Sequence, residues 1–147
     1  MATIRTMTMD DYDQVYSLWM SCKGMGLNNL DDSRDGISFY LNRNPRTCFV
    51  GVESDEIVGA IIAGHDGRRG YIYHTAVHPD MRRMGIGKQL LDASLSALRE
   101  EGINKVALVV FESNETGNAF WESMGFGQRF DLAYRNKALT DIIRYDT

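Results

Sequence analysis

The sequence of 147 residues lacks the features that mark secreted, metal-binding or membrane proteins. It has only two cysteines, Cys22 and Cys48, and the three histidines show no metal-site spacing with them or with one another. The chain does not open with a basic start followed by an apolar core, and it contains no run of about 18 apolar residues. These absences predict reduced cysteines, no bound metal, no membrane segment and a cytoplasmic location.

An excess of positive charge is also missing. The chain carries 16 Lys plus Arg against 20 Asp plus Glu, which gives a formal net charge of -4. No long-range field therefore draws the molecule to nucleic acid or to anionic membranes, and nucleic acid is not an expected partner. The sequence has no repeat or linker, and its length and apolar content are typical of a single domain over residues 1–147.

The first half of the chain alternates helical and strand patterns. A strand over residues 3–7 precedes Thr8, which with Asp11 forms a capping signal for a helix over residues 9–22. A weaker helical pattern ends before Pro45. Three strand patterns follow, TCFVGVES, EIVGAIIAGH and YIYHTAVHP, and a tight turn joins the first two. They predict an antiparallel meander.

The second half predicts a strand, helix, strand unit. An amphipathic helix starts near Ile86 and ends at a Gly102 cap. Residues 106–111, VALVVF, are continuously apolar, which is typical of a strand covered on both faces and parallel to the strand before the helix. A short helix over 116–124 and a terminal strand from Phe126 complete the chain. The fold class is therefore α/β with a mixed, mostly antiparallel sheet and a central parallel pair.

The segment HPDMRRMGIGKQLL, residues 78–91, predicts an anion site. It places Gly85 and Gly87 at a helix N-terminus, where free N–H groups and the helix dipole favour negative charge. Mobile cations come from Arg82, Arg83 and Lys88. A solvated glycine turn is the alternative. Known nucleotide loops do not fit, because Leu90 stands where a third glycine is needed and no Walker glycine precedes Gly87-Lys88.

At these residues the chain resembles the GNAT superfamily of acyl-CoA-dependent N-acyltransferases. The family's diphosphate loop reads Gln/Arg-x-x-Gly-x-Gly/Ala, and residues 82–87, RRMGIG, match it. Downstream, Asn114, Trp121 and the sequence MGF at 124–126 fall in the register of a second family motif. The two motifs together cover about residues 71–126.

The resemblance implies a GNAT-like sheet whose central parallel strands splay apart, with helices on both faces. It also implies acetyl-CoA as the cosubstrate, with its diphosphate on the amides of residues 83–88 and its pantetheine paired with the Val77 backbone. The expected binding residues are Val77, Arg82, Arg83, Met84, Gly85, Ile86, Gly87, Lys88, Asn114 and Trp121. Asn114 also suits an N-cap, and the two roles can coexist.

Catalysis by such an enzyme requires removal of a proton from an amine that is mostly ammonium at neutral pH. Strict alternation places Tyr71, Tyr73, Thr75 and Val77 on one side of their strand and Ile72, His74 and Ala76 on the other. We therefore expect Tyr73 to act in a water-mediated relay, with Glu112 as a carboxylate alternative and His74 pointing away. An aromatic core role for Tyr73 and a solvated role for Glu112 remain open.

Many relatives have a tyrosine at the position of Trp121, where it protonates the leaving thiolate. An indole N–H can donate a hydrogen bond but cannot act as a general acid near neutral pH. We expect Trp121 to pack against the pantetheine instead.

Three functions are compatible with these patterns. The first is an N-acetyltransferase that acts on a primary amine of a small molecule, peptide or protein, as a monomer or a homodimer. A noncatalytic acyl-CoA-binding module and a nucleotide-binding protein are the alternatives. The loop over residues 22–36 and the end of the chain are expected to form the acceptor side. Asp31, Asp32 and Asp35 in this loop favour a cationic or neutral acceptor.

Overall fold

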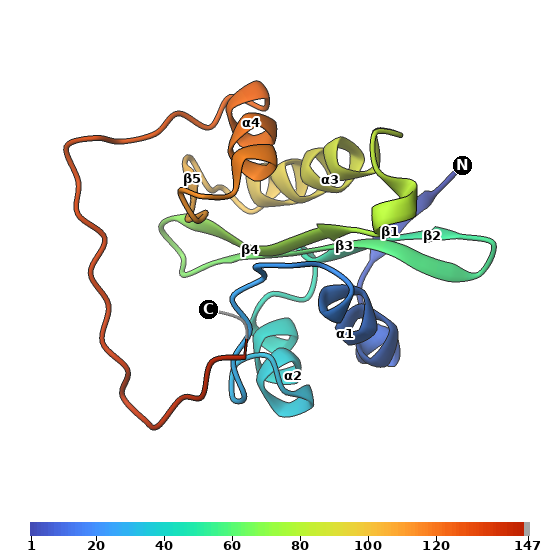
Figure 1. The fold of residues 1–147 in the computed structure, drawn as a ribbon, viewed down its shortest axis with the longest axis horizontal. Coiled ribbons are helices and arrows are strands. Elements are labelled where there is room, and N and C mark those ends of the chain that lie inside the picture. Colours follow the sequence, from blue (N-terminus) through green and yellow to red (C-terminus); the bar gives the residue numbers. More distant parts are fainter. Residues whose placement is uncertain (146–147) are drawn as a thin grey trace.

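The computed structural model describes residues 1–145 and is built around one five-stranded sheet (Figure 1). The sheet contains strands β1 (Thr3–Thr6), β2 (Phe49–Glu53), β3 (Glu56–His65), β4 (Gly70–Val77) and β5 (Val106–Leu108) in that spatial order. The helices are α1 (Tyr12–Met20), α2 (Arg34–Arg43), α3 (Ile86–Glu100) and α4 (Glu115–Ser123), with 3-10 turns η1 (Met9–Asp11) and η2 (Pro79–Met81). Helices α1 and α2 cover one face, and α3 and α4 cover the other (Figure 1).

The expected mixed sheet is confirmed. Strands β1 to β4 form an antiparallel meander, and α3 returns the chain so that β5 lies parallel to β4. The β4–β5 pairing extends only from Gly70 to Ile72, although β4 continues to Val77. The two parallel strands therefore separate over the second half of β4, which leaves that edge of β4 without a strand partner among residues 1–145.

Local signals in the sequence explain several boundaries. The Asp11 carboxylate accepts a hydrogen bond from the Thr8 N–H at 2.9 Å, as the capping signal predicts. The β2–β3 turn has positive φ at both Ser54 (51°) and Asp55 (65°), the conformation of a type I′ hairpin. Gly102 ends the α3 region with a φ of 84°.

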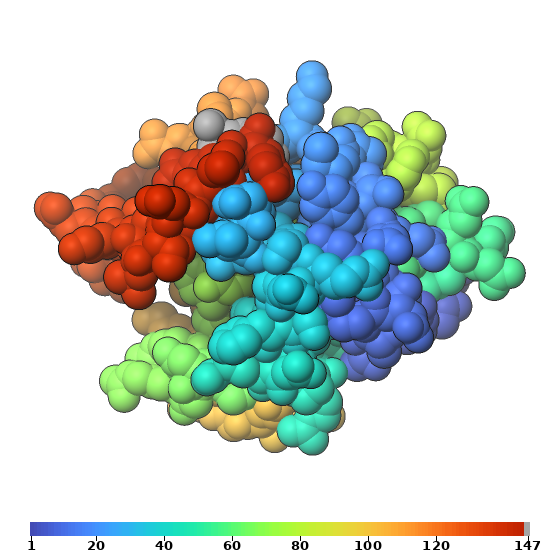
Figure 2. Space-filling view, turned by 90° about the horizontal axis from the view of Figure 1, so that it is seen from below, coloured from blue at the N-terminus to red at the C-terminus, as the bar shows by residue number. Residues whose placement is uncertain are grey.

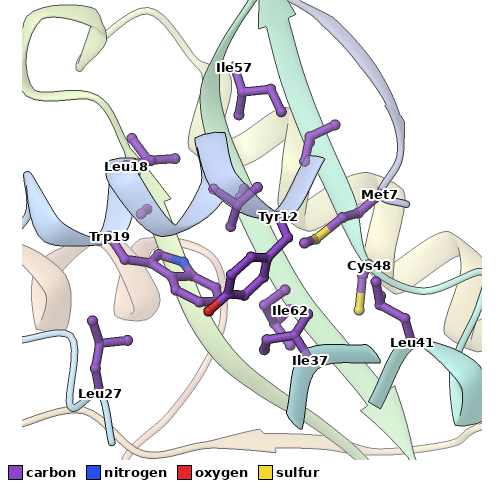
Figure 3. Close-up of a cluster of buried hydrophobic side chains, with 14 residues drawn as sticks. Met7, Tyr12, Leu18, Trp19, Leu27, Ile37, Leu41, Cys48, Ile57 and Ile62 are labelled. Carbon is purple, nitrogen blue, oxygen red and sulfur yellow. The ribbon is translucent and has the colours of Figure 1, made fainter. Parts of the chain in front are cut away.

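Two apolar clusters fix the helices to the sheet. On the α1/α2 face, the buried cluster includes Trp19, Leu27, Ile37 and Ile62, and Figure 3 shows these side chains converging from both layers. On the α3 face, a second cluster brings together side chains of the sheet and the helix, including Val58, Ile61, Ala63, Ile72, Ile86, Leu90 and Leu91. The sheet is thus apolar on both sides, as expected for two covering layers.

The expectation of a strand over 106–111 covered on both faces is wrong. Only Val106–Leu108 form a strand, and Val109 and Phe111 are 57% and 47% exposed. Val106 and Leu108 pack against the α3-side cluster, whereas Ala107 between them is exposed. The strand lies at the edge of the sheet, so helices cover only one of its faces.

The expected terminal strand from Phe126 is also absent among the described residues. Phe126 packs on the α3-side cluster, but residues 127–143 contain no strand. This C-terminal segment instead runs around the β5 edge and returns to the α2 face (Figure 1), where Asn28 and Arg144 form an isolated bridge. The apolar side chains of Phe130, Leu132 and Tyr134 alternate along it, but they remain exposed because no strand pairs with the segment.

Candidate functional site

The glycine loop ends with unpaired amides at the start of α3. Gly85 is the N-cap residue with a φ of 82°, a left-handed conformation that suits glycine, and no side chain caps the helix. The first amide with a backbone partner is that of Gln89, which donates to the Gly85 carbonyl at 3.0 Å. The amides of Ile86, Gly87 and Lys88 have no hydrogen-bond partner in the described part of the chain. They leave an uncapped helix N-terminus, a feature that favours anions.

The side chains predicted to surround this end differ in their surroundings. Arg83 and Met84 are exposed, and Arg83 has a positive φ of 66°. The Arg82 guanidinium donates to the Val77 carbonyl at 3.1 Å, and Lys88 pairs with Asp92 at 2.7 Å. Both cations are solvent-accessible, so they can exchange these partners for an anion at the helix end.

Ile86 and Gly87 also have packing roles that the loop motif alone does not indicate. The Ile86 side chain is buried in the α3-side cluster, so only its amide is available at the helix end. A Cβ at Gly87 would lie 3.3 and 3.4 Å from ring atoms of Phe120 on α4. The absence of a side chain at Gly87 therefore lets α4 approach the first turn of α3.

A buried hydroxyl marks the separation of β4 and β5. Thr75 pairs with Ile61, whose side chain belongs to the α3-side cluster, so the Thr75 side chain faces α3. Its Oγ1 is buried and has no hydrogen-bond partner in the described part of the chain. Such a group costs stability unless a bound molecule satisfies it. Thr75 belongs to no motif in the sequence, and a threonine on a strand gives no signal that its hydroxyl is unpartnered.

Asn114 immediately precedes α4, and Trp121 lies on this helix. Asn114 caps the helix, because its side-chain oxygen accepts a hydrogen bond from the Gly117 N–H at 2.9 Å. The Trp121 ring packs edge-to-face against Phe120 and Phe126, with centroid distances of 5.0 and 5.3 Å. The N-cap alternative for Asn114 is confirmed, and Trp121 packs as an aromatic wall against the α3-side cluster.

The two predicted catalytic residues lie in different surroundings. The Tyr73 ring contacts the tilted ring of Tyr71 and the edge-to-face ring of Tyr40, with centroid distances of 4.6 and 5.7 Å, and burial raises its pKa above the ordinary tyrosine value. Burial likewise raises the pKa of Tyr71 to about 12. Neither phenol is thus a base near neutral pH. Glu112 is exposed in the turn between β5 and α4.

The expectation of strict alternation along β4 is wrong, because the strand contains a bulge. Ile61 pairs with Thr75 and Ala63 pairs with Ile72, so Tyr73 and His74 together face the single residue Ile62. Both side chains consequently turn to the α1/α2 face, where Tyr73 meets Tyr40 and His74 meets Trp19. His74 does not point away from Tyr73, whereas Thr75 and Val77 lie on the opposite, α3 side.

On that face His74 binds a buried carboxylate. Its Nε2 lies 2.6 Å from Oδ1 of Asp32, and the His74 and Asp32 side chains are 13% and 5% exposed. The other Asp32 oxygen accepts the Asn28 amide at 2.8 Å, and the Tyr12 hydroxyl donates to the Asp32 carbonyl at 2.6 Å. Asp32 is therefore part of a packed network, unlike its exposed neighbours Asp31 and Asp35.

Residues 1–145 contain no group of three or more His, Cys, Asp or Glu side chains arranged to hold a metal ion. Within the same residues, no helix is both long and apolar enough to span a membrane. Three features of this region can take part in binding or chemistry. They are the uncapped N-terminus of α3, the buried Thr75 hydroxyl where β4 and β5 separate, and the His74–Asp32 pair at the bulge.

Comparisons with known proteins agree with this geometry. The family model described as the Acetyltransferase (GNAT) family matches residues 12–126. An acetyltransferase of Pectobacterium atrosepticum is 33% identical over 123 residues, which are 84% of this chain and 86% of that protein. The crystal structure of Ard1 from Thermoplasma volcanium superposes with a TM-score of 0.75 at 26% identity, covering 84% of this chain and 81% of that one.

A further solved structure with a similar fold contains coenzyme A. PaiA N-acetyltransferase from Thermoplasma acidophilum, in complex with coenzyme A, has a TM-score of 0.74 and 15% identity, and the match covers 85% of this chain and 89% of that one. At this identity the likeness concerns the fold. Together with the family match, the splayed strands and the open helix end, these findings show that the chain belongs to the GNAT family and is an acetyl-CoA-dependent N-acetyltransferase.

Proposed function

We propose that this enzyme transfers the acetyl group of acetyl-CoA to a primary amine of a small molecule, peptide or protein. The observation that carries the proposal is the row of unpaired amides at the α3 N-terminus, beside the point where β4 and β5 separate. The cosubstrate would be held by residues on both sides of this point: Val77, Arg82, Arg83, Met84, Gly85, Ile86, Gly87, Lys88, Asn114 and Trp121. When bound, acetyl-CoA supplies the thioester carbon that the amine attacks.

Each part of the chain has a separate task in this proposal. The amides of residues 86–88 and the cations of Arg82 and Arg83 bind the diphosphate, since helix N-termini and guanidinium groups both favour phosphate oxygens. The free edge of β4 near Val77 offers backbone hydrogen bonds to an extended pantetheine. Trp121 excludes water by packing, and the Thr75 hydroxyl is available as a donor inside the separated strands.

Tyr73 is proposed to order a water between the amine and its proton acceptor. Its hydroxyl keeps its proton at neutral pH, because burial raises its pKa. It can therefore donate and accept hydrogen bonds in a relay without ionising. Glu112 is the alternative carboxylate, and its exposed position in the β5–α4 turn favours a solvated role.

The acceptor side is proposed to lie on the α1/α2 face, between the loop before α2 and the C-terminal segment. Figure 2 shows these two segments side by side on that face, and the Asn29 amide donates to the Ile143 carbonyl at 3.0 Å. Asp31 and Asp35 are exposed there and would concentrate cationic amines. Asp32 is excluded from this role because it is buried against His74.

An acceptor screen read by release of free CoA thiol tests the proposal. The panel contains spermidine, lysine, kanamycin and a peptide with a free N-terminus, with a dicarboxylic amino acid as the anionic member. A cationic acceptor should lose kcat/KM several-fold in Asp31→Asn/Asp35→Asn, whereas Asp55→Asn/Glu56→Gln in the β2–β3 hairpin removes the same charge from exposed residues and is the matched control. A dianionic best acceptor that does not respond to the double variant would refute the acceptor proposal.

A further inference from the structure

The bulge in β4 gives the molecule an oriented imidazole at the place where its two parallel strands separate. Pairing with β5 ends at Ile72, and the next two residues, Tyr73 and His74, form the bulge. We propose that His74 is the general base of the acetyl transfer and that Asp32 positions it. This inference rests on the proposed transfer to an amine and names the group that receives the amine proton.

The tautomer of His74 follows from its partner. Because an ionised carboxylate only accepts hydrogen bonds, the 2.6 Å contact from Nε2 to Asp32 places the neutral imidazole proton on Nε2. Nδ1 then carries a lone pair. No residue of the described chain forms a hydrogen bond to Nδ1, so this nitrogen is available to a substrate proton or to a water held by Tyr73.

Two further hydrogen bonds hold Asp32 in place beside its contact with His74. Its Oδ2 accepts the Asn28 amide at 2.8 Å, and the backbone around it is held by the Tyr12 hydroxyl. Trp19 packs edge-on against the imidazole with a centroid distance of 5.0 Å, which fixes the plane of the ring. A buried carboxylate behind an imidazole stabilises the imidazolium form, and this is what a general base needs once it has accepted a proton.

The other titratable groups around the pair do not replace it. Tyr73, next in the chain, has a raised pKa, and burial also raises the pKa of Tyr12. Asp31, which contributes to the raised pKa of Tyr73, is exposed and stays on the solvent side of the loop. Among the groups that face this part of β4, the imidazole is therefore the one that offers an unpaired nitrogen lone pair as a base.

The reaction balances with one proton released to solvent. Nδ1 of His74 takes a proton from the ammonium form of the acceptor, directly or through water, and the neutral amine then attacks the thioester carbon. The C–N bond forms as the C–S bond breaks, and coenzyme A leaves with the electron pair on sulfur. The surplus proton on the new amide nitrogen passes to the thiolate, and His74 returns its proton to water.

Histidine NMR tests the orientation without an acceptor. The chain has three histidines, so long-range proton–nitrogen correlations of the imidazoles are readily assigned with His74→Gln and His65→Gln. The expected result is that neutral His74 carries its proton on Nε2, with Nδ1 unprotonated. A proton on Nδ1 in the neutral ring would overturn the proposal, even if no amine in the panel were acetylated.

Kinetics test the chemical role. With an amine that the wild-type enzyme acetylates, we expect His74→Gln to lower kcat by at least about 100-fold and to remove the fall in kcat at low pH. Asp32→Asn, which can reverse the tautomer, should lower kcat similarly. The matched control is His65→Gln, because His65 forms a similar 2.8 Å contact with Glu101 at the far end of β3. It should leave kcat and its pH profile unchanged.

Two measurements separate this role from a structural one. Calorimetry should find the acetyl-CoA Kd of folded His74→Gln within about threefold of wild type, which would show that the cosubstrate site is intact. A kcat within threefold of wild type that keeps its acidic limb would overturn the assignment of His74. Failure of every amine with wild-type enzyme would instead contradict the proposed acceptor class, and the NMR result would still decide the His74–Asp32 geometry.

Discussion

Because no side chain caps the N-terminus of α3, we predict that a negative charge introduced at Gly87 weakens acetyl-CoA binding. Gly87→Glu and Gly87→Gln add side chains of nearly equal size. In both, the new Cβ would lie 3.3 Å from the Phe120 ring, which must move by a few tenths of an ångström. The two variants differ in one negative charge. Their comparison therefore separates electrostatic repulsion of a diphosphate from disturbed packing between α3 and α4.

The expected magnitude follows from simple electrostatics. A carboxylate roughly 5 Å from a diphosphate with about two negative charges is repelled by roughly 1.7 kcal/mol even at the dielectric constant of water. That energy corresponds to about a 15-fold weaker Kd. The same carboxylate in the first helical turn should stabilise the free protein, by about 0.3–1 kcal/mol, because it faces the positive end of the helix dipole. Binding and stability are thus expected to change in opposite directions.

Titration calorimetry with acetyl-CoA at low and high salt is the assay, and thermal unfolding of the free proteins is its control. Gly87→Glu should bind at least about tenfold more weakly than Gly87→Gln at low ionic strength, with a smaller difference at high salt because mobile ions screen the repulsion. Equal Kd values for the two folded variants would refute the placement of the diphosphate at this helix end.

Three further substitutions test other parts of the structure. Trp121→Phe should keep turnover within about tenfold with a modest rise in KM, because the ring packs rather than transfers protons, and a loss of about 1,000-fold with unchanged acetyl-CoA affinity would show otherwise. Thr75→Val should raise the free energy of unfolding by about 1 kcal/mol in denaturant titrations, since it removes an unpartnered buried hydroxyl, yet it should weaken acetyl-CoA binding measured by calorimetry. Arg5→Gln should lower the free energy of unfolding at pH 7 by about 1 kcal/mol, because the Arg5 side chain is 47% exposed and solvent screens its pair with Asp11. Hydrogen bonds from Arg5 lower the pKa of Asp11 from its ordinary 3.8, so this stabilisation is present above about pH 4 and is lost as pH falls through the lowered pKa, where wild type and variant should converge.

The elements that were predictable from sequence are those specified by local or contiguous patterns. The capping pair Thr8 and Asp11, the Ser54–Asp55 turn and the glycine start of α3 each depend on a few adjacent residues with defined backbone preferences. The parallel β4–β5 pairing followed from a strand, helix, strand order, which leaves few alternative topologies. The loop and motif residues predicted to bind the cosubstrate also belong to this class, because they follow one another closely in the sequence.

The errors came from features that depend on neighbours far apart in the sequence. Val109 and Phe111 continue an apolar run, but among residues 1–145 helices cover only one face at this edge of the sheet, and the strand ends at Leu108. The alternating side chains of Phe130, Leu132 and Tyr134 are compatible with a strand, yet a strand requires a paired edge, and the segment passes β5 without pairing. The spacing of apolar residues depends on one segment alone, whereas strand pairing depends on two segments that are distant in the sequence.

The bulge at Tyr73 and His74 has the largest functional consequence of these nonlocal features. Alternation along β4 alone would put one of the two side chains under α3 and leave the other on the α1/α2 face. The bulge arises because two residues of β4 occupy the place opposite Ile62 of β3, and nothing in the sequence of β4 requires it. It brings a phenol and an imidazole to the same face, beside the buried Asp32 of a loop that is 42 residues earlier in the chain. If the two proposals hold, the pairing of β3 with β4 determines which side chains reach the amine, and the glycine loop determines where the cosubstrate binds.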